Sequence, residues 1–561
     1  MKKLMSNEEL SNKIINYNVV TFDIFDTLIK RDCQSPNMIF KEVEYRYKQL
    51  HKRTLDFSTL RYNAELDLYK QGNITPTIEE IYDIIPLNKS VKDELMNLEI
   101  DTEIQLSCAN KPLFDLYLDC LKQGKCVYAI SDMYLPHRVL QSILKKCNYI
   151  VSNIWVSSDK RANKSSGALF EVFLRETGIK RAEVLHIGDN YKADIKGASK
   201  AGIKAVQIPA HMKNTTYYNT KKNNKESWEN MFLYPFVNNH INFISKRSSQ
   251  IGFETLGPTV YGFCLWLNSM KKKYNFEKLL FCARDVLQTM EIYNTLFPDD
   301  EKNTVYLCVS LKSLKKPYEA ALGIDKSQEA LHQLHLIKRY LKQLGCTGKV
   351  AMVDSGCGGH TQHMLEVILG KTCDFHGLYM RISKNFHKNI DDKESFPYMF
   401  NKRPSARSFI SGALFETLLS ASHGRTLGYE ENSDGNVVPI WGESNPQKDL
   451  LTEFQEGIRY FATVWKNNIN SKRNINSTYI ENSFLNFSFF PTKSDVNIMS
   501  QITGGNETYM GIVLDKDKSI LLNLRDTYWK GGYLCNTFKY YKGICHIYLL
   551  LDVIILNIMG F

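Results

Sequence analysis

The sequence predicts an α/β protein with two Rossmann-like domains, each built on a doubly wound parallel sheet. Two series of short β-type runs support this prediction, because helical patterns separate the runs within each series. The first series occupies residues 18–25, 126–130, 154–158, 184–188 and 204–208. The second occupies residues 278–282, 305–309, 349–353 and 377–380. With 561 residues, the chain is long enough for both domains to bury a core.

We expect the first domain to span residues 1–210. Between its first two strands, residues 36–120 carry charged and apolar residues at helical spacing, which predicts a helical cap over the active-site end of the sheet. Residues 211–250 turn polar and basic and are expected to form a linker. The second α/β domain is expected over residues 251–430, and the pattern assigns no fold to residues 431–561.

Composition and charge exclude several classes of protein. The net charge is +11, but no Arg-rich helix or nucleic-acid module accompanies it, so we expect no specific nucleic-acid partner. The 13 cysteines form no CxxC pair, which argues against a disulfide framework or a zinc site and favours reduced thiols in a cytoplasm. The first 18 residues are polar and carry no secretory signal. The sequence predicts no oligomeric state.

The final segment, residues 543–561, is mostly apolar and approaches membrane-spanning length. It contains His546, Asp552 and Asn557, and a carboxylate near a bilayer centre costs about 2.5–3.5 kcal/mol. Two interpretations stay open for it: a buried terminal element, or contact with a membrane.

Polar residues follow four runs of the first series. The first run ends in Asp23 to Thr27 (DIFDT), and later runs are followed by Ser131, by Lys164 and by Gly188 to Asp194 (GDNYKAD). Carboxyl ends of parallel strands meet at one edge of the sheet, where ligands bind. Phosphoryl transfer to a carboxylate needs these residue types: an Asp to attack phosphorus, a hydroxyl and an ammonium to hold phosphate oxygens, and further carboxylates to hold Mg²⁺.

With these four motifs, residues 18–210 resemble the haloacid dehalogenase superfamily of hydrolases. The resemblance implies a Rossmann-like core with a mobile cap, Mg²⁺ as cofactor and an aspartyl-enzyme intermediate. It also implies roles for the motif residues. Asp23 would be the nucleophile, Ser131 and Lys164 would bind the phosphate and stabilise the intermediate, and Thr27 would bind substrate and fix the loop. Asp23, the Phe25 backbone carbonyl, Asp189 and Asp194 form the implied Mg²⁺ site, in which Asp194 is a supporting carboxylate that orients Lys164 or a metal-bound water.

Phe25 departs from the phosphatase pattern of this family. Typical phosphatases carry a second Asp two residues after the nucleophile, and that Asp protonates the leaving group and later activates water. Asp26 is next to this place, but successive residues on an extended chain alternate faces, so its side chain is expected to point elsewhere. Three consequences stay open: a substrate with a good leaving group, another acid such as one from the cap, or Asp26 acting through an irregular turn.

Two strand ends of the second series are also polar. Phe281 to Asp285 (FCARD) follows one strand, and Val353 to Thr361 (VDSGCGGHT) follows another and leads into a helix. Glycines in this position let backbone N–H groups approach an anion, so Arg284, Asp285 and Asp354 are candidates for binding a phosphate, a nucleotide or a sugar phosphate, with an ordinary tight turn as the alternative.

Other polar residues of the second series are weaker candidates. Glu416 and His423 lie in an otherwise apolar stretch and are candidates for the same crevice. His360 and His363 share a helix face but lack a third metal ligand at a compatible spacing.

The whole layout is similar to bacterial two-domain hydrolases found with surface-polysaccharide biosynthesis. We therefore predict an Mg²⁺-dependent phosphohydrolase that acts on a small-molecule or glycan phosphate, such as a sugar phosphate, a nucleotide sugar or a phosphorylated glycan. Three alternatives stay open: a dehalogenase-type carbon-centred hydrolase, a transferase whose chemistry lies in the second domain, and a binding scaffold with weak catalysis.

Overall fold

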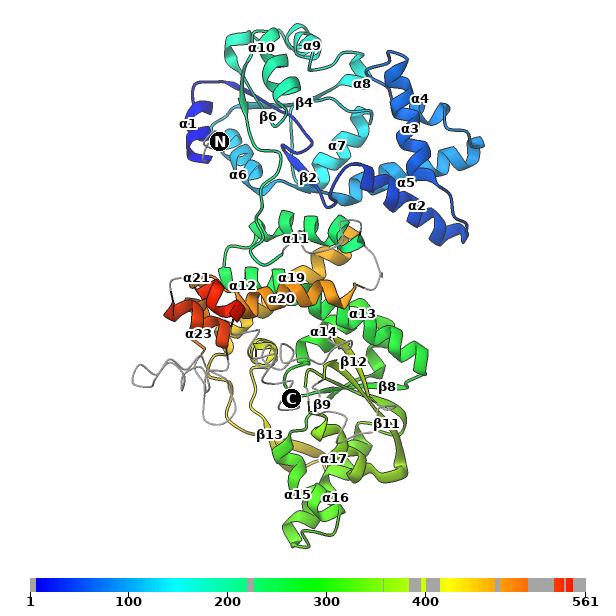
Figure 1. Ribbon diagram of the computed structural model, residues 1–561, viewed down its shortest axis with the longest axis vertical. Coiled ribbons are helices and arrows are strands. Elements are labelled where there is room, and N and C mark those ends of the chain that lie inside the picture. The colour runs from blue at the N-terminus through cyan, green and yellow to red at the C-terminus, as the bar shows by residue number, and fades with distance from the viewer. Residues whose placement is uncertain are drawn as a thin grey trace. The chain divides into compact units, whose positions relative to one another are not determined.

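The computed structural model describes residues 7–218, 227–356, 358–382, 395–399, 414–469, 475–502, 529–538 and 541–547. The chain divides into two compact units, which Figure 1 shows in ribbon form. Unit 1 contains residues 1–216 and 220–243, and unit 2 contains residues 217–219 and 244–561.

Unit 1 is built on a parallel sheet of five strands in the order β5-β4-β1-β6-β7. Its strands are β1 (Val19–Phe22), β4 (Cys126–Ser131), β5 (Ile154–Val156), β6 (Val184–Gly188) and β7 (Lys204–Gln207). Helices α6 (Lys111–Lys122), α7 (His137–Lys146), α9 (Ala168–Thr177) and α10 (Gly197–Lys200) contact these strands. The remaining core elements are α1 (Asn7–Ile14), α8 (Ser157–Lys160), the 3₁₀ turn η1 (Arg181–Glu183) and the π-helical turn η2 (Tyr191–Lys196). The doubly wound sheet predicted from the first series is confirmed.

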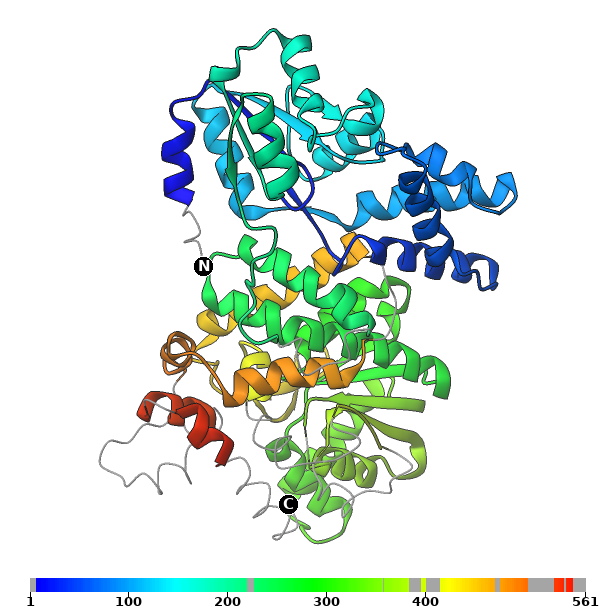
Figure 2. The ribbon, with the colours of Figure 1, turned by 45° about the horizontal axis from the view of Figure 1, so that its top comes forward.

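The cap is a group of four helices inserted between β1 and β4. It contains α2 (Asn37–His51), α3 (Phe57–Lys70), α4 (Ile78–Asp83) and α5 (Lys89–Leu106), which pack on one another and lie to one side of the sheet in Figures 1 and 2. The chain enters the cap through β2 (Ile29–Arg31) and leaves it through β3 (Ser107–Ala109), and these two strands pair antiparallel. The predicted cap range of 36–120 runs further than these helices, because α6 contacts β4 of the core.

Part of the segment expected to be a linker packs on unit 1. The π-helical turn η4 (Glu229–Leu233), helix α11 (Tyr234–His240) and the turn η5 (Ile241–Phe243) form what we call the connector. The connector is helical and packed because apolar residues within the polar stretch, among them Phe232, Leu233, Phe236 and Val237, are buried. Helix α11 contacts β2 at the root of the cap.

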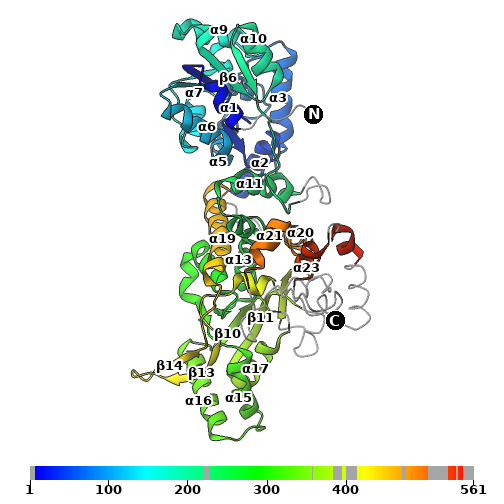
Figure 3. The same cartoon turned by 90° about the vertical axis from the view of Figure 1, so that its left-hand side faces the viewer.

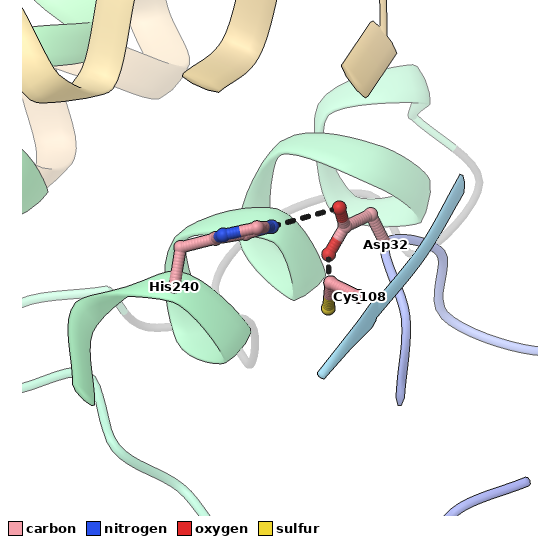
Figure 4. A group of neighbouring side chains, drawn as sticks. All are labelled: Asp32, Cys108 and His240. Atoms are coloured by element: carbon pink, nitrogen blue, oxygen red, sulfur yellow. Dashed lines mark hydrogen bonds and ion pairs between the residues drawn. The ribbon is translucent and has the colours of Figure 1, made fainter. Parts of the chain in front are cut away.

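A buried polar cluster joins the connector to both strands at the root of the cap (Figure 4). Asp32 follows β2, Cys108 lies in β3 and His240 ends α11. His240 Nε2 lies 2.9 Å from Asp32 Oδ2, and the Cys108 thiol and the Asn239 amide donate to Asp32 Oδ1 at 3.2 and 3.0 Å. Burial works against the ionised form of Asp32, but His240 and these donors outweigh it and hold the pKa of Asp32 below its usual range.

Unit 2 contains a second parallel sheet of five strands in the order β12-β11-β10-β8-β9. Its strands are β8 (Lys278–Cys282), β9 (Thr304–Leu307), β10 (Gly348–Asp354), β11 (Cys373–Arg381) and β12 (Ser395–Met399). Helices between the strands are α14 (Leu287–Leu296), α15 (Leu311–Ala321), α16 (Gln328–Gln343) and α17 (His360–Leu369), with 3₁₀ turns η7 (Pro298–Asn303) and η8 (Gly370–Thr372). The second predicted sheet is therefore confirmed, and it has an edge strand, β12, that the sequence pattern did not indicate.

The region after residue 430 adds to unit 2. A two-stranded hairpin of β13 (Thr426–Glu431) and β14 (Val437–Trp441) packs on α15 and α16, as Figure 3 shows. Helix α19 (Lys448–Ile469) packs against α12 (Arg247–Ile251), the π-helical turn η6 (Gly252–Leu256) and α13 (Gly257–Tyr274). The last helices are α20 (Ser477–Phe489), α21 (Lys493–Met499) and α23 (Lys530–Thr537).

The end of the chain bears on the membrane question. Among the described residues, no helix is both long and apolar enough to cross a membrane. Most of the predicted apolar segment 543–561 lies outside the described residues.

We expect His240→Ala to release the connector locally. The substitution leaves the buried Asp32 carboxylate without its ring partner, which costs about 3 kcal/mol or more because a buried charge loses its compensation. Hydrogen exchange of the α11 amides measures this as a loss of protection of roughly a hundredfold.

His51→Ala is the matched control for this measurement. The His51–Glu94 pair is as close, at 2.7 Å, but the two side chains are 42% and 37% exposed, so its loss should cost less than about 1 kcal/mol. Equal loss of protection in both variants would contradict a stabilising role for the buried cluster.

Candidate active site

The structure brings together the four motifs predicted in the first domain. Asp23 follows β1, Ser131 ends β4, Lys164 lies in the loop between β5 and α9, and Asp189 follows β6. Their strands are neighbours in the sheet order β5-β4-β1-β6. All four residues therefore lie at one carboxyl edge, where an open α/β sheet binds its ligands.

The Lys164 ammonium is the centre of this edge. Its Nζ donates to Asp23 Oδ1 at 2.5 Å and to Asp194 Oδ1 at 2.6 Å, and the lysine side chain is 2% exposed. Burial alone would lower the pKa of Lys164, but the two carboxylates outweigh it and raise that pKa above its usual range. Lys164 therefore stays a cation in a desolvated position.

Asp194 is held by three donors of the protein. Besides Lys164, the His186 ring donates to Oδ1 at 3.2 Å and the Asn190 backbone N–H donates to Oδ2 at 2.8 Å. Burial opposes ionisation, but Lys164 and His186 outweigh it and keep the pKa of Asp194 below its usual range. Gly188 makes room for this carboxylate, because a Cβ at Gly188 would lie 2.2 Å from Asp194 Cγ. Asp194 thus contacts the Lys164 ammonium, as a supporting carboxylate for Lys164 would.

Two polar strand residues that sequence reasoning missed complete the network. Thr21 and His186 are register partners on β1 and β6, and Thr21 Oγ1 lies 2.9 Å from His186 Nδ1. Burial lowers the pKa of His186, which favours the neutral ring. Its Nδ1 then accepts a hydrogen bond from the Thr21 hydroxyl, and its Nε2–H donates to Asp194. The available signal was a lone polar residue in each of two apolar strands.

The carboxylates of this edge carry more negative charge than the protein compensates. Burial raises the pKa of Asp23 to about 7, with the Asp194 and Asp189 carboxylates adding to the shift and Lys164 opposing it. Burial and its carboxylate neighbours also raise the pKa of the half-buried Asp189. A divalent cation bound here would remove this repulsion and favour ionised Asp23.

The donor set at this edge fits such a cation. Asp23, Asp189 and Asp194 each offer a carboxylate oxygen, and these oxygens lie within 4.8 Å of one another. Oxygen ligands of this kind suit Mg²⁺. Because protein donors occupy both Asp194 oxygens, Asp23 and Asp189 are the side chains best placed to bind the ion directly, with the Phe25 carbonyl beside them in the chain.

The loop after β1 places the remaining predicted residues. Buried Thr27 donates from Oγ1 to Asp189 Oδ1 at 3.5 Å, and its carbonyl accepts from the Asn110 amide at 2.7 Å, so Thr27 ties this loop to its surroundings. The Arg31 guanidinium lies 3.9 Å from the centre of the Phe25 ring. Asp26 has a φ of 60°, and one of its carboxylate oxygens lies 3.8 Å from Lys30 Nζ.

Two cavities flank this loop within unit 1. The cap cavity has a volume of about 620 Å³ and is lined by Phe25, Asp132 and Asn163 of the core and by Glu65 and Tyr69 of the cap, among others. The connector cavity has a volume of about 780 Å³. Asp26 and Lys30 line it together with residues 206–214 and parts of the connector. Both volumes suit a small-molecule ligand.

The predicted residues of the second domain lie at the carboxyl edge of its own sheet. Asp285 follows β8, and its two carboxylate oxygens accept from the Ser355 and Ser420 hydroxyls, each at 3.2 Å. Asp354 ends β10 and accepts from the Gly356 backbone N–H at 3.0 Å. Burial raises the pKa of Asp285 to about 6, with Arg284 opposing this shift and Asp354 adding to it. These candidates therefore influence one another electrostatically.

The weaker candidates of the second domain have different partners. Glu416 joins the edge, since its Oε1 accepts from Arg381 Nη2 at 2.8 Å and Arg381 ends β11. His423 pairs with the Tyr306 hydroxyl at 2.7 Å. His363 contacts the Tyr318 hydroxyl at 3.3 Å. Within the described part of the chain, neither His360 nor His363 belongs to a group of three side chains that could hold a metal.

A family model supports the identity of the first unit. Residues 17–202 match the model described as haloacid dehalogenase-like hydrolase. The match confirms the resemblance predicted for residues 18–210, over residues 17–202. The matched range ends before the connector and unit 2.

Solved structures similar to the chain cover a little over a third of it. They include a putative phosphatase from Clostridium difficile, with 19% identity over 35% of this chain and 87% of the other, at a TM-score of 0.25. The putative HAD-hydrolase YfnB from Bacillus subtilis bound to magnesium has 18% identity over 36% and 93%, at 0.27. A 2-haloacid dehalogenase from Pseudomonas syringae has 16% identity over 38% and 90%, at 0.28. No curated protein matches the chain.

We expect Mg²⁺ to stabilise unit 1 through Asp189. A ligand that binds only the folded state at 100 times its Kd adds about 2.7 kcal/mol. Thermal unfolding of chelator-treated protein, with and without Mg²⁺, should show a raised Tm in the wild type and a much smaller rise in Asp189→Asn.

Asp119→Asn serves as the control, because Asp119 lies on α6, its side chain is 49% exposed and its carboxylate pairs with Lys122. It should respond to Mg²⁺ like the wild type. An Mg²⁺ response that is absent from the wild type, or unchanged in Asp189→Asn, would contradict a metal site at this edge.

Proposed function

We propose that unit 1 is an Mg²⁺-dependent phosphohydrolase that works through an aspartyl-phosphate on Asp23. The observation that supports this proposal most strongly is the buried Lys164 ammonium, held between Asp23 and Asp194 beside a third carboxylate, Asp189. A site for a phosphate dianion needs fixed positive charge for the equatorial oxygens and a carboxylate set for a divalent cation.

Each residue at the edge has a task in this reaction. Asp23 attacks phosphorus and forms the covalent intermediate, which water then hydrolyses. The Ser131 hydroxyl and the Lys164 ammonium hold the phosphate oxygens, and Asp194 with His186 keeps Lys164 in place. Mg²⁺, held by Asp23, Asp189 and the Phe25 carbonyl, would neutralise charge between nucleophile and phosphate.

We propose a small-molecule or glycan phosphate as the substrate, with sugar phosphates, nucleotide sugars and phosphorylated glycans as the classes to test. The cap cavity, with a volume of about 620 Å³, is large enough to hold the leaving group of such a substrate. Its lining mixes polar and aromatic side chains, among them Asp132, Asn163, Tyr69 and Phe40, and such a lining suits a polyhydroxylated group.

A second candidate function is carbon-centred hydrolysis of the dehalogenase type. Phe25 favours it, because the acid of the usual phosphatases is missing from that place. Such an enzyme needs no Mg²⁺, so metal dependence separates the two candidates.

A third candidate places the chemistry in unit 2, as a glycan-related transferase. The arrangement of Asp285 between two serine hydroxyls, next to Asp354, favours it. Variants of the two units separate this candidate from the first.

Asp23→Asn should abolish Mg²⁺-dependent phosphate release from a panel of phosphate esters. Loss of the nucleophile removes the covalent step, so we expect a fall on the order of 10⁴-fold or more. Release of inorganic phosphate by purified full-length protein, with Mg²⁺ and with a chelator, measures it.

Asp119→Asn should keep wild-type activity, since this exposed carboxylate lies on α6 away from the motifs. Activity that survives Asp23→Asn and disappears in Asp354→Asn or Arg284→Ala would move the chemistry to unit 2. Activity that is lost in Asp23→Asn but needs no metal would favour the carbon-centred candidate.

A further inference from the structure

Phe25 leaves the proposed phosphohydrolase without an acid in the usual place, and the cap cavity shows which carboxyls can reach a leaving group. Only two carboxyl side chains line this cavity among the described residues, Asp132 of the core and Glu65 of the cap. Asp26 is not among them, because it lines the connector cavity and faces Lys30.

Glu65 is hydrogen-bonded to other residues of the cap. Its Oε2 accepts from the Arg61 guanidinium at 2.9 Å, and its Oε1 accepts from the Tyr69 hydroxyl at 3.1 Å. Arg61 is fully buried and pairs in addition with Glu99. Both Glu65 oxygens are therefore occupied by donors of the cap.

Asp132 has the opposite surroundings. It follows Ser131 at the end of β4, and its Oδ1 accepts from the Lys164 backbone N–H at 2.9 Å. Among the described residues no donor to Oδ2 is found, and Asp132 lines the cap cavity together with Phe25. Burial raises the pKa of Asp132 in spite of the Lys164 charge, and Asp194 adds to the shift.

The position of Asp132 relative to the reacting groups follows from its neighbours. Lys164 contacts both residues: its backbone N–H donates to Asp132, and its Nζ donates to the proposed nucleophile Asp23. The neighbouring Ser131 is the phosphate ligand of the proposed site. Asp132 therefore links the cap cavity, which it lines, to Lys164, which contacts Asp23.

We infer that Asp132 is the general acid and base of unit 1, an assignment that rests on the proposed phosphohydrolase function. In the first step Asp23 attacks phosphorus, the bond from phosphorus to the leaving oxygen breaks, and the Asp132 proton passes to that oxygen to give the free alcohol. In the second step the oxygen of a water molecule attacks the phosphorus of the aspartyl-phosphate, and Asp132 takes a proton from that water. The bond between phosphorus and Asp23 breaks, and inorganic phosphate leaves.

Comparison of two leaving groups in Asp132→Asn tests this role. The Asn carbonyl keeps the hydrogen bond from the Lys164 N–H but has no proton to transfer. With an alkyl ester such as glycerol phosphate, we expect turnover to fall roughly 10²–10⁴-fold, the usual contribution of a general acid. With p-nitrophenyl phosphate the leaving phenolate needs no proton, so the first step should stay within about threefold of wild type. The second step lacks its base, so rapid mixing should show a burst of p-nitrophenolate equal to the enzyme concentration, followed by slow turnover.

Glu65→Gln and Asp26→Asn test the rival acids with the same two esters. Neither should show a loss that depends on the leaving group. A leaving-group-dependent loss in one of these variants, or equal loss of the first step with both esters in Asp132→Asn, would overturn the role of Asp132. Unchanged kinetics in Asp132→Asn would overturn it as well.

The wild type tells this failure apart from failure of the proposed function. Metal-dependent release from both esters by the wild type, with any of the overturning results above, leaves the phosphohydrolase intact and removes only Asp132. A wild type that releases phosphate from neither ester overturns the proposed function and the role of Asp132 together.

Discussion

The site of unit 1 depends on one buried ammonium shared by two carboxylates. Lys164 is almost completely out of water, and the desolvation of its charge is tolerable only because Asp23 and Asp194 both accept from it. Asp194 needs its own support from His186 and the Asn190 N–H. Asp23, Lys164, Asp194 and a strand of the central sheet therefore form one hydrogen-bonded unit.

A second buried carboxylate has a similar position at the root of the cap. Asp32, which follows the incoming strand, accepts from Cys108 on the outgoing strand and from Asn239 and His240 of the connector, so the connector is fixed where the cap joins the core. Arg31, one residue earlier, spans the same junction, since its guanidinium lies over Phe25 and pairs with Glu103 on the last cap helix. The cap, the connector and the loop after β1 are thus joined through the adjacent residues Arg31 and Asp32.

The two sheets share an arrangement of polar residues at one edge but differ in the charged groups found there. Both collect polar side chains at the carboxyl edge of parallel strands, where no further strand atoms fill the space. In unit 1 a lysine balances the carboxylates. In unit 2 Arg381 pairs with Glu416, while serine hydroxyls hold Asp285. The carboxyl edges of both sheets therefore gather carboxylates, but the groups that compensate these carboxylates differ between the two units.

The sequence by itself determined both sheets and the four strand-end motifs, because apolar β-type runs that stop abruptly at Asp23, Ser131 or Asp189 are local patterns. It could not find Thr21 and His186, which become partners only when β1 and β6 align in register. Nor could it show that Asp132 lines a cavity, because that cavity forms only when the cap packs beside the core. The connector was also hidden, since its buried residues sit in a polar stretch and reveal their role only against unit 1. Tertiary structure decided these points because each depends on contacts between residues far apart in the chain.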